Sequence, residues 1–129
     1  IRARVEDPTP DVDADPSLAV EILVNLLENA HHASPEGEII ELSARPSAEV
    51  PGRVWLEVAD RGAGLSPELT RSVRIVGSGE GSPPGLGIEI ARSLAMLNAG
   101  SVEWFSRPGG GTIARLDLPA APVTAEVVP

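Results

Sequence analysis

The sequence has no cysteine, no lysine and no tyrosine, and its aromatic residues are two tryptophans and one phenylalanine. The absence of cysteine excludes disulfide bonds, thiolate metal sites and cysteine nucleophiles. No apolar run approaches the roughly 20 residues that a membrane-spanning helix needs, and the chain does not open with the pattern of a signal peptide. Any binding or catalysis must therefore use other side chains and the backbone.

One sign of charge dominates. Ten basic residues, all of them arginine, stand against 19 acidic residues, and the formal net charge is −9. Such an acidic domain is a poor candidate for binding nucleic acid or an anionic membrane surface. We therefore expect no nucleic-acid partner.

The length of 129 residues fits one domain with little room for a second. Leu, Ile, Val and Phe together number 35, which is enough for a core, while 13 glycines and 13 prolines make the chain rich in turns. We expect a domain over residues 1–118 and a flexible tail over residues 119–129. Because the first residue is Ile1 rather than methionine, we also expect the chain to be a piece of a longer protein.

Helical and strand patterns both occur. Asp15-Pro16 is typical of a helix start, and apolar residues follow at helical spacing to about Ala33. A second helix is predicted from Gly85 to a stop signal at Asn98–Gly100, and a short one near residues 66–68. Strands are predicted at residues 1–5, 12–14, 39–42, 54–59, 101–106 and 112–118. A turn is expected at 45–52, and a hairpin turn at 107–111 joins the last two strands. The mixture predicts an α/β (α+β) two-layer sandwich with helices on one face of a mixed sheet.

Two segments carry polar side chains that suit ligand binding. Asn25 and Asn29 lie on one face of the first helix, and an asparagine carbonyl oxygen is an acceptable Mg²⁺ ligand; alternatively, both only hydrogen-bond neighbouring loops. Asp60 follows a buried strand and precedes Gly62 and Gly64, so its carboxylate can accept a hydrogen bond from an exocyclic amine while the glycines allow close backbone approach. The alternative for this segment is an ordinary turn.

A third segment, Gly85-Leu86-Gly87, opens the second helix, where free N–H groups suit phosphate, although glycine also serves plain turns. Taken in sequence order, the motifs resemble those of the sensor histidine kinase ATP-binding domain, in the GHKL superfamily that also includes DNA gyrase and MutL. The resemblance runs from about Val12 to Pro119 and is carried by Asp15-Pro16, Asn25 to Ala30, Asp60 to Gly64, Gly85 to Gly87 and Gly111-Thr112. It implies a Bergerat-type fold, with a mixed sheet of about five strands, about three helices on one face, and ATP between helices and a lid.

The resemblance also implies a role for each matching residue. Asn29 would coordinate the Mg²⁺ that bridges the phosphates of ATP, with Asn25 beside it. Asp60 would accept a hydrogen bond from the adenine amino group, and Gly62 and Gly64 would let the backbone pass beneath the nucleotide. Gly85, Leu86 and Gly87 would place the start of the second helix against the phosphates. Thr112 would support the adenine pocket.

The position four residues before Asn29 bears on the reaction. Hydrolysing members of the superfamily and anti-sigma serine kinases have a glutamate there, whereas this chain has Asn25. An amide cannot act as a general base, but a neutral histidine acceptor is already a nucleophile and needs mainly positioning and charge neutralisation. We therefore expect an ATP-dependent protein histidine kinase rather than an anti-sigma-type serine kinase. Glu28 either polarises the acceptor or is a solvated helix charge.

The chain departs from the family pattern around the phosphates. His32 stands where the family often has a lysine that reaches toward phosphate, and Pro83 replaces the first glycine of the lid-end motif. The lid is short, and residues 71–76 replace the phenylalanine-containing box; Arg71 or Arg74 there either reaches the γ-phosphate or lies on the surface. These departures favour, as an alternative, a degenerate module that binds nucleotide or partners without catalysis.

Neither His31 nor His32 fits the phospho-accepting histidine, which in this family lies on a separate dimerisation helix and is followed by an acidic residue. We therefore expect the acceptor on a dimerisation domain outside this chain, and a response regulator as a further partner. The isolated domain is expected to be a monomer and the full-length protein a homodimer. The expected location is the cytoplasm, on the cytoplasmic side of the membrane if the full-length protein is anchored there.

Overall fold

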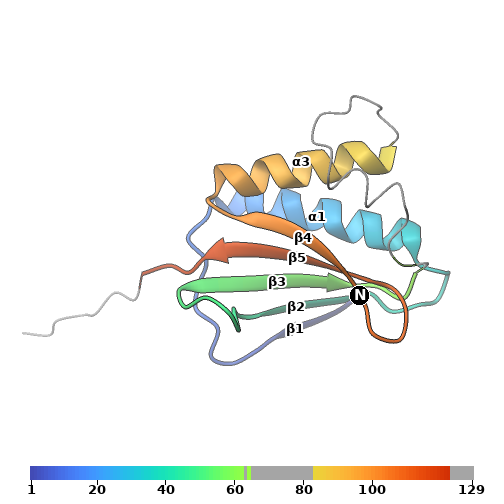
Figure 1. Ribbon diagram of the computed structural model, residues 1–129, viewed down its shortest axis with the longest axis horizontal. Helices are drawn as coiled ribbons and strands as arrows, with labels where there is room; N and C mark the ends of the chain where they lie inside the picture. Colours follow the sequence, from blue (N-terminus) through green and yellow to red (C-terminus); the bar gives the residue numbers. More distant parts are fainter. Residues whose placement is uncertain (63, 65–82, 123–129) are drawn as a thin grey trace, which may run out of the picture.

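In the part of the chain that the structure describes, the protein is an open five-stranded sheet with two helices packed on one face (Figure 1). A computed structural model describes residues 1–62, 64 and 83–122. In chain order the described elements are β1 (Arg2–Val5), α1 (Pro16–Ala33), β2 (Glu41–Pro46), β3 (Arg53–Ala59), α3 (Pro83–Leu97), β4 (Ser101–Ser106) and β5 (Thr112–Pro119). The predicted two-layer sandwich is confirmed, and the third helix expected near residues 66–68 lies outside the described residues.

The sheet is mixed, with the strand order β1-β2-β3-β5-β4. β1 runs parallel to β2, and the other three pairings are antiparallel. β3 is central: Ala59 at its end pairs with Glu41 at the start of β2 and with Ile113 near the start of β5. The residue after β3, Asp60, therefore emerges where two neighbouring strands begin.

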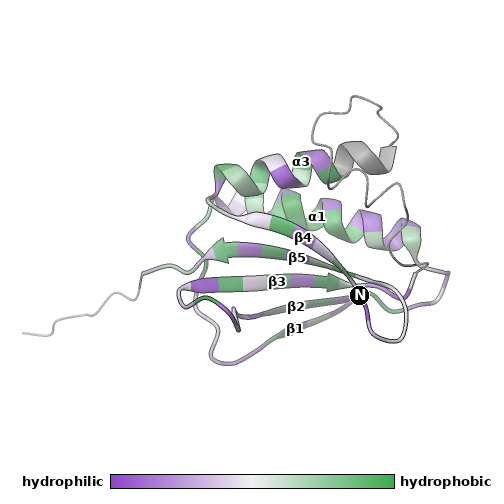
Figure 2. Ribbon diagram, viewed as in Figure 1, coloured by the Kyte–Doolittle hydropathy of each residue, from purple (hydrophilic) through white to green (hydrophobic). Residues whose placement is uncertain are grey.

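The core lies between the sheet and the two helices. On β5 every second residue is buried, and Figure 2 shows the matching alternation of hydrophobic and hydrophilic residues along β3 and β5. This period of two is what a strand needs to present one apolar face. The cluster of buried residues between the layers consists of Ile22, Leu26 and Ala30 of α1, Ala91 and Ala95 of α3, and Ile40, Val58, Val102, Ala114, Leu116 and Leu118 of the sheet region.

The two helices run antiparallel, and a hydrogen bond joins the start of α1 to the end of α3. The Asp15 carboxylate caps α1 by accepting hydrogen bonds from the N–H groups of Ser17 (2.9 Å) and Leu18 (3.3 Å), as expected for an N-cap residue. The N–H of Asp15 in turn donates to Oδ1 of Asn98 just after α3, at 2.8 Å. The C-terminal end of α1 consequently lies beside the beginning of α3, at the same end of the molecule as the end of β3 (Figure 1).

The other face of the sheet is polar and forms a network of its own. Glu57 accepts hydrogen bonds from Arg45 and Arg115, both at 3.0 Å, and the Arg115 guanidinium lies 3.7 Å from the ring centroid of Trp55. The Trp55 indole N–H donates to Asp117 at 2.9 Å. Arginine stems and stacked guanidinium groups can cover an aromatic side chain in this way, so Trp55 is buried on a face that carries no helix.

This network corrects the predicted strand at 39–42 and the predicted turn from residue 45. The strand β2 is Glu41–Pro46, and Arg45 lies inside it opposite Trp55. The apolar pair at positions 39 and 40 suggested an earlier strand, but the ion pair of Arg45 with Glu57 and its stacking over Trp55 favour pairing further along the chain.

Smaller differences from prediction occur at other element ends. α3 begins at Pro83 rather than Gly85, which proline permits because the first helical N–H groups have no intrahelical partner. The expected strand at 12–14 is a single bridge between Val12 and Ala120. β5 ends at Pro119, and the N–H of Ala121 donates to the carbonyl of Asp11, so pairing continues past residue 118.

None of the helices that the structure describes combines the length and apolar character of a membrane span.

Replacing Ile22, which is completely buried on α1, by alanine should lower the free energy of unfolding by about 2–5 kcal/mol, since a cavity remains in the core. The matched control is Val20→Ala on the same helix, where the side chain is 59% exposed; this change should cost less than about 1 kcal/mol. Urea denaturation of both variants measures the difference. Equal losses would contradict the assigned core.

Candidate functional site

Asp60 is the centre of the candidate site. It directly follows β3, and it is 5% exposed. Its Oδ1 accepts hydrogen bonds from the N–H groups of Gly62 (2.8 Å) and Thr112 (3.2 Å), and its own N–H donates to the carbonyl of Thr112 (2.9 Å). Within the described part of the chain, Oδ2 has no hydrogen-bond partner. The backbone thus fixes one carboxylate oxygen, and the other has no donor among the residues that the structure describes.

Two glycines allow neighbouring elements to close around Asp60. A Cβ atom on Gly62 would overlap the carbonyl of Ala33 at the end of α1, and a Cβ atom on Gly111 would overlap the carbonyl of Asp60 itself. The close approach expected at Gly62 therefore occurs against the chain's own helix end. Gly64 has a φ of +85°, in the left-handed region that glycine adopts without steric cost.

Asn29, the expected magnesium ligand, and Asn25 beside it lie on the C-terminal half of α1. Asn25 and Asn29 are each partly buried, whereas Glu28 and His32 are exposed. The Nδ2 atom of Asn29 is buried and has no hydrogen-bond partner among the described residues. Buried polar groups normally have a partner, so this amide has hydrogen-bonding or ligand capacity that the described residues do not use.

Gly85, Leu86 and Gly87 lie in the first turns of α3, close to the helix N-terminus at Pro83. Because α1 and α3 are antiparallel, this N-terminus and the asparagines of α1 belong to the same end of the helical layer (Figure 1). A helix N-terminus carries N–H groups without intrahelical partners and a partial positive charge. Arg71, Arg74 and the lid lie outside the described residues.

The structure thus gathers the expected residues in two groups: one around Asp60, and one formed by Asn25 and Asn29 of α1 with Gly85 to Gly87 at the start of α3. Asp60, Gly62 and Thr112 are joined directly by hydrogen bonds, and Gly62 also contacts the end of the helix that carries Asn29. Thr112 is buried and reaches Asp60 through its main chain. The individual roles expected for these residues in nucleotide binding stay predictions.

Sequence reasoning missed Arg107, at the start of the hairpin between β4 and β5. Its guanidinium donates to the carbonyl oxygen of Asp60 at 3.1 Å and forms an ion pair with Glu41 at 3.4 Å. An arginine in a Pro- and Gly-rich hairpin has no distinctive pattern. Only the register that brings the end of β3 beside the starts of β2 and β5 reveals this contact.

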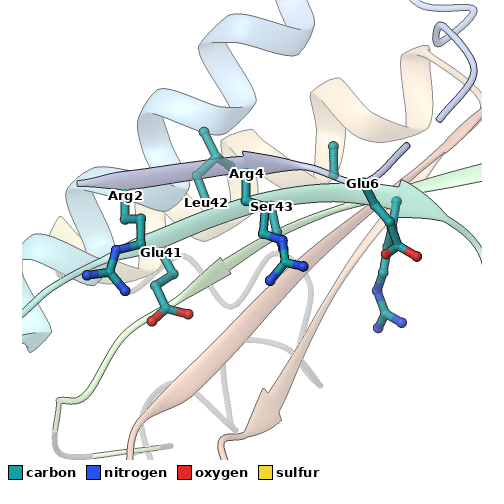
Figure 3. Close-up of a pocket in the computed structure, with 8 residues that line it drawn as sticks. Arg2, Arg4, Glu6, Glu41, Leu42 and Ser43 are labelled. Carbon is teal, nitrogen blue, oxygen red and sulfur yellow. The ribbon is translucent and has the colours of Figure 1, made fainter. Parts of the chain in front are cut away.

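A separate cavity of about 420 Å³ lies on the edge strand β1 and its neighbour β2. Figure 3 shows Arg2, Arg4 and Glu41 pointing to the same side of these strands. The residues that line the cavity are Arg2, Arg4, Glu6, Glu41, Leu42, Ser43, Ala44 and Arg45, and no residue expected in the nucleotide site is among them.

The architecture is that of the catalytic domains of histidine kinases. Solved structures of histidine kinases are similar to this chain along almost its whole length. Full-length ShkA, solved in complex with AMPPNP, is 29% identical with a TM-score of 0.75, covering 96% of this chain and 26% of ShkA. The mycobacterial sensor histidine kinase MprB has a TM-score of 0.74 over 95% of this chain and 82% of its own; at 24% identity, this likeness shows the fold alone.

Sequence comparison identifies the family. The model of the histidine kinase-, DNA gyrase B- and HSP90-like ATPases matches residues 14–122, and the chain belongs to this family. It is 35% identical over 118 residues to the C4-dicarboxylate transport sensor protein DctS of Rhodobacter capsulatus, an alignment that covers 89% of this chain and 18% of DctS. It is 34% identical over 123 residues to the histidine protein kinase DivJ of Caulobacter vibrioides, covering 89% of this chain and 20% of DivJ. The chain therefore spans about a fifth of the length of these relatives.

Replacing Gly111 by alanine should destabilise the domain and displace Asp60, because the new Cβ would overlap the Asp60 carbonyl. Gly110→Ala is the matched control: its φ of +111° equals that of Gly111 (+110°) within a degree, but no atom lies within 4 Å of the new Cβ. Both changes add left-handed backbone strain, and Gly111→Ala should cost about 1 kcal/mol or more beyond the control.

Urea denaturation measures this difference in the free energy of unfolding, and amide NMR spectra report the environment of Asp60 and Gly62. We expect these amide signals to move in Gly111→Ala and not in Gly110→Ala. Equal losses of stability with unchanged Asp60 signals would contradict the close packing of the hairpin on Asp60.

Proposed function

We propose that this chain is the catalytic and ATP-binding domain of a two-component sensor histidine kinase, which binds Mg-ATP and transfers the γ-phosphate to a histidine on a dimerisation domain outside the chain. The observation that carries the proposal is the buried Asp60 carboxylate, with Oδ1 held by two main-chain N–H groups and Oδ2 without a partner among the described residues. Family membership and the AMPPNP complex of the 29% identical ShkA support it.

The chemistry of Asp60 suits adenine in particular. An ionised carboxylate only accepts hydrogen bonds. Adenine presents an exocyclic amino group, a donor, at the ring position where guanine presents a carbonyl oxygen. The partner-free oxygen of Asp60 would bind the first and repel the second, and the main-chain bonds to Oδ1 keep it from turning away. With two tryptophans and one phenylalanine in the whole chain, stacking on rings is a poor alternative grip on the base.

Asn29 fits a magnesium ligand. Its amide is partly buried and its Nδ2 has no partner, and a half-turn of the amide group exchanges the positions of Nδ2 and Oδ1. Magnesium accepts a single protein oxygen when phosphate oxygens and water complete its octahedral shell. Among the described residues, no group of three His, Cys, Asp or Glu side chains could hold a metal ion, which favours an ion shared with phosphates. A bound Mg²⁺ would neutralise phosphate charge and orient the γ-phosphate.

The beginning of α3 is suited to hold phosphate. The helix N-terminus offers main-chain N–H groups, and Gly85 and Gly87 place no side chain there. Because the chain has no lysine, the main chain and the metal would have to replace the lysine that relatives often use. Exposed His32 stands at the corresponding position of α1.

The residues of α1 favour transfer to histidine over hydrolysis. Asn25 cannot take a proton from water or from a serine hydroxyl, so this chain offers position and charge compensation rather than general-base catalysis. Exposed Glu28 is free to approach an acceptor presented by another domain. The dimerisation domain, a response regulator as the onward acceptor, a monomeric isolated domain within a homodimeric full-length protein, and a cytoplasmic site of action belong to the same proposal.

The second candidate function is a degenerate module that docks to partners without catalysis. The observations that favour it are Pro83 at the start of α3, the replaced phenylalanine box and the exposed histidine in place of lysine. Calorimetric titration of the domain with ADP and with AMPPNP, each with and without Mg²⁺, separates the two functions. The kinase proposal expects binding that Mg²⁺ strengthens, and no binding at millimolar nucleotide would contradict it.

Replacing Asp60 by asparagine tests the adenine contact with little change of shape. The amide oxygen can still accept from Gly62 and Thr112, but the second position becomes an N–H donor facing the adenine amino group. We expect the ADP dissociation constant to rise about 10- to 100-fold, as loss of a charged hydrogen bond predicts. Asp117→Asn, at the other end of β5, removes the same charge as a control and should leave the affinity unchanged. Equal affinities of Asp60→Asn and the wild-type domain would exclude the contact.

Replacing Asn29 by alanine should abolish the gain in ADP affinity that Mg²⁺ produces, while affinity without Mg²⁺ changes little. A lost metal ligand typically lowers the magnesium-dependent affinity by about tenfold or more. Glu21→Ala, an exposed change on the same helix, is the control. Calorimetry at several Mg²⁺ concentrations measures the effect. An undiminished magnesium response in Asn29→Ala would show that the metal ligand lies elsewhere.

A further inference from the structure

Arg107 ties together the ends of three strands at the candidate site. Its side chain is 12% exposed, and its guanidinium donates to the carbonyl oxygen of Asp60 after β3 and pairs with Glu41 at the start of β2. The residue itself follows β4. A guanidinium can hold two acceptors at once because its N–H groups have a fixed planar geometry.

The hairpin that begins at Arg107 makes the other contacts to Asp60. The N–H of Arg107 donates to the carbonyl of Gly111 at 2.9 Å, and the N–H of Gly110 donates to the carbonyl of Arg107 at 3.0 Å. This closed turn brings Gly111 against the Asp60 carbonyl and aims the N–H of Thr112 at Oδ1. The main chain of Asp60 is therefore held both by the Arg107 side chain and by the turn that Arg107 opens.

We propose that Arg107 is a positioning residue of the nucleotide site: by holding the carbonyl of Asp60 it sets the direction of the Asp60 carboxylate, and hence the affinity and selectivity for adenine. The inference rests on the proposed nucleotide binding at Asp60. Arg107 acts through Asp60, because its guanidinium contacts the Asp60 carbonyl and the Glu41 carboxylate.

Arg53 offers a matched comparison at the opposite end of the sheet. It also bridges a carboxylate and a main-chain carbonyl, pairing with Asp117 and donating to the carbonyl of Ala99 at 2.8 Å. Its side chain is 25% exposed. The two arginines make the same type of contact, so a purely structural contribution should be similar for both. They differ in that only the carbonyl held by Arg107 belongs to the residue that carries the candidate adenine contact.

The experiment measures dissociation constants for ADP and GDP by calorimetry in the wild-type, Arg107→Ala, Arg107→Lys and Arg53→Ala domains, at a temperature where thermal unfolding shows all of them folded. We expect Arg107→Ala to weaken ADP binding about tenfold and to reduce the preference for ADP over GDP. Arg107→Lys keeps the charge but not the paired geometry and should be intermediate. Arg53→Ala should lose stability without a change in affinity or preference.

A double-mutant cycle with Asp60→Asn tests whether Arg107 acts through Asp60. If it does, adding Arg107→Ala to Asp60→Asn weakens ADP binding much less than adding it to the wild-type domain. Additive effects would overturn the positioning role. So would an Arg107→Ala domain whose dissociation constants for ADP and for GDP both match those of the wild-type domain. A wild-type domain that binds no ADP contradicts the proposed function itself, and the inference falls with it, whereas wild-type binding with unaltered Arg107 variants contradicts the inference alone.

Discussion

The candidate site depends on the main-chain hydrogen bonds that hold one oxygen of a buried carboxylate. Oδ1 of Asp60 accepts from Gly62 and from Thr112, and these bonds join the loop after β3 to the first residue of β5. The loop can lie there because Gly62 passes against the end of α1 and Gly111 passes against Asp60, where any side chain would collide with backbone. These hydrogen bonds fix the orientation of the carboxylate, and its second oxygen has no donor among the described residues.

The two faces of the sheet have different roles: one packs against the helices, and the other carries a network of charged side chains. The face under α1 and α3 supplies the apolar core, and the antiparallel packing of these helices brings the asparagines of α1 and the N-terminus of α3 to the end of the sheet where Asp60 lies. The opposite face contains arginine and carboxylate pairs around Trp55. Arg45 and Arg115 of this acidic chain are thus engaged away from the site. With no lysine present, phosphate binding would depend on helix N–H groups and metal, which reconciles a net charge of −9 with an anionic ligand.

How far prediction from sequence succeeds depends on whether a signal is local. Asp15 before a proline and a periodic apolar stripe marks a helix start without tertiary information, and the structure confirms it. Asp60 after a buried strand was likewise recognisable, although its hydrogen bonds to Thr112 depend on a register that no local pattern contains. Arg45 was misplaced in a turn because its strand is stabilised by Glu57 across the sheet. Arg107 gave no signal because both of its acceptors are more than 40 positions away in the chain.

An NMR titration of the isotope-labelled domain with ADP in the presence of Mg²⁺ tests the central claim most directly. The account predicts that the backbone amide signals of Gly62 and Thr112 and the side-chain amide of Asn29 shift together with one dissociation constant. The indole signal of Trp55, on the opposite face of the sheet, should stay in place. Saturable shifts at Trp55 with none at Gly62 and Thr112 would contradict the account, because the nucleotide would then bind somewhere other than Asp60.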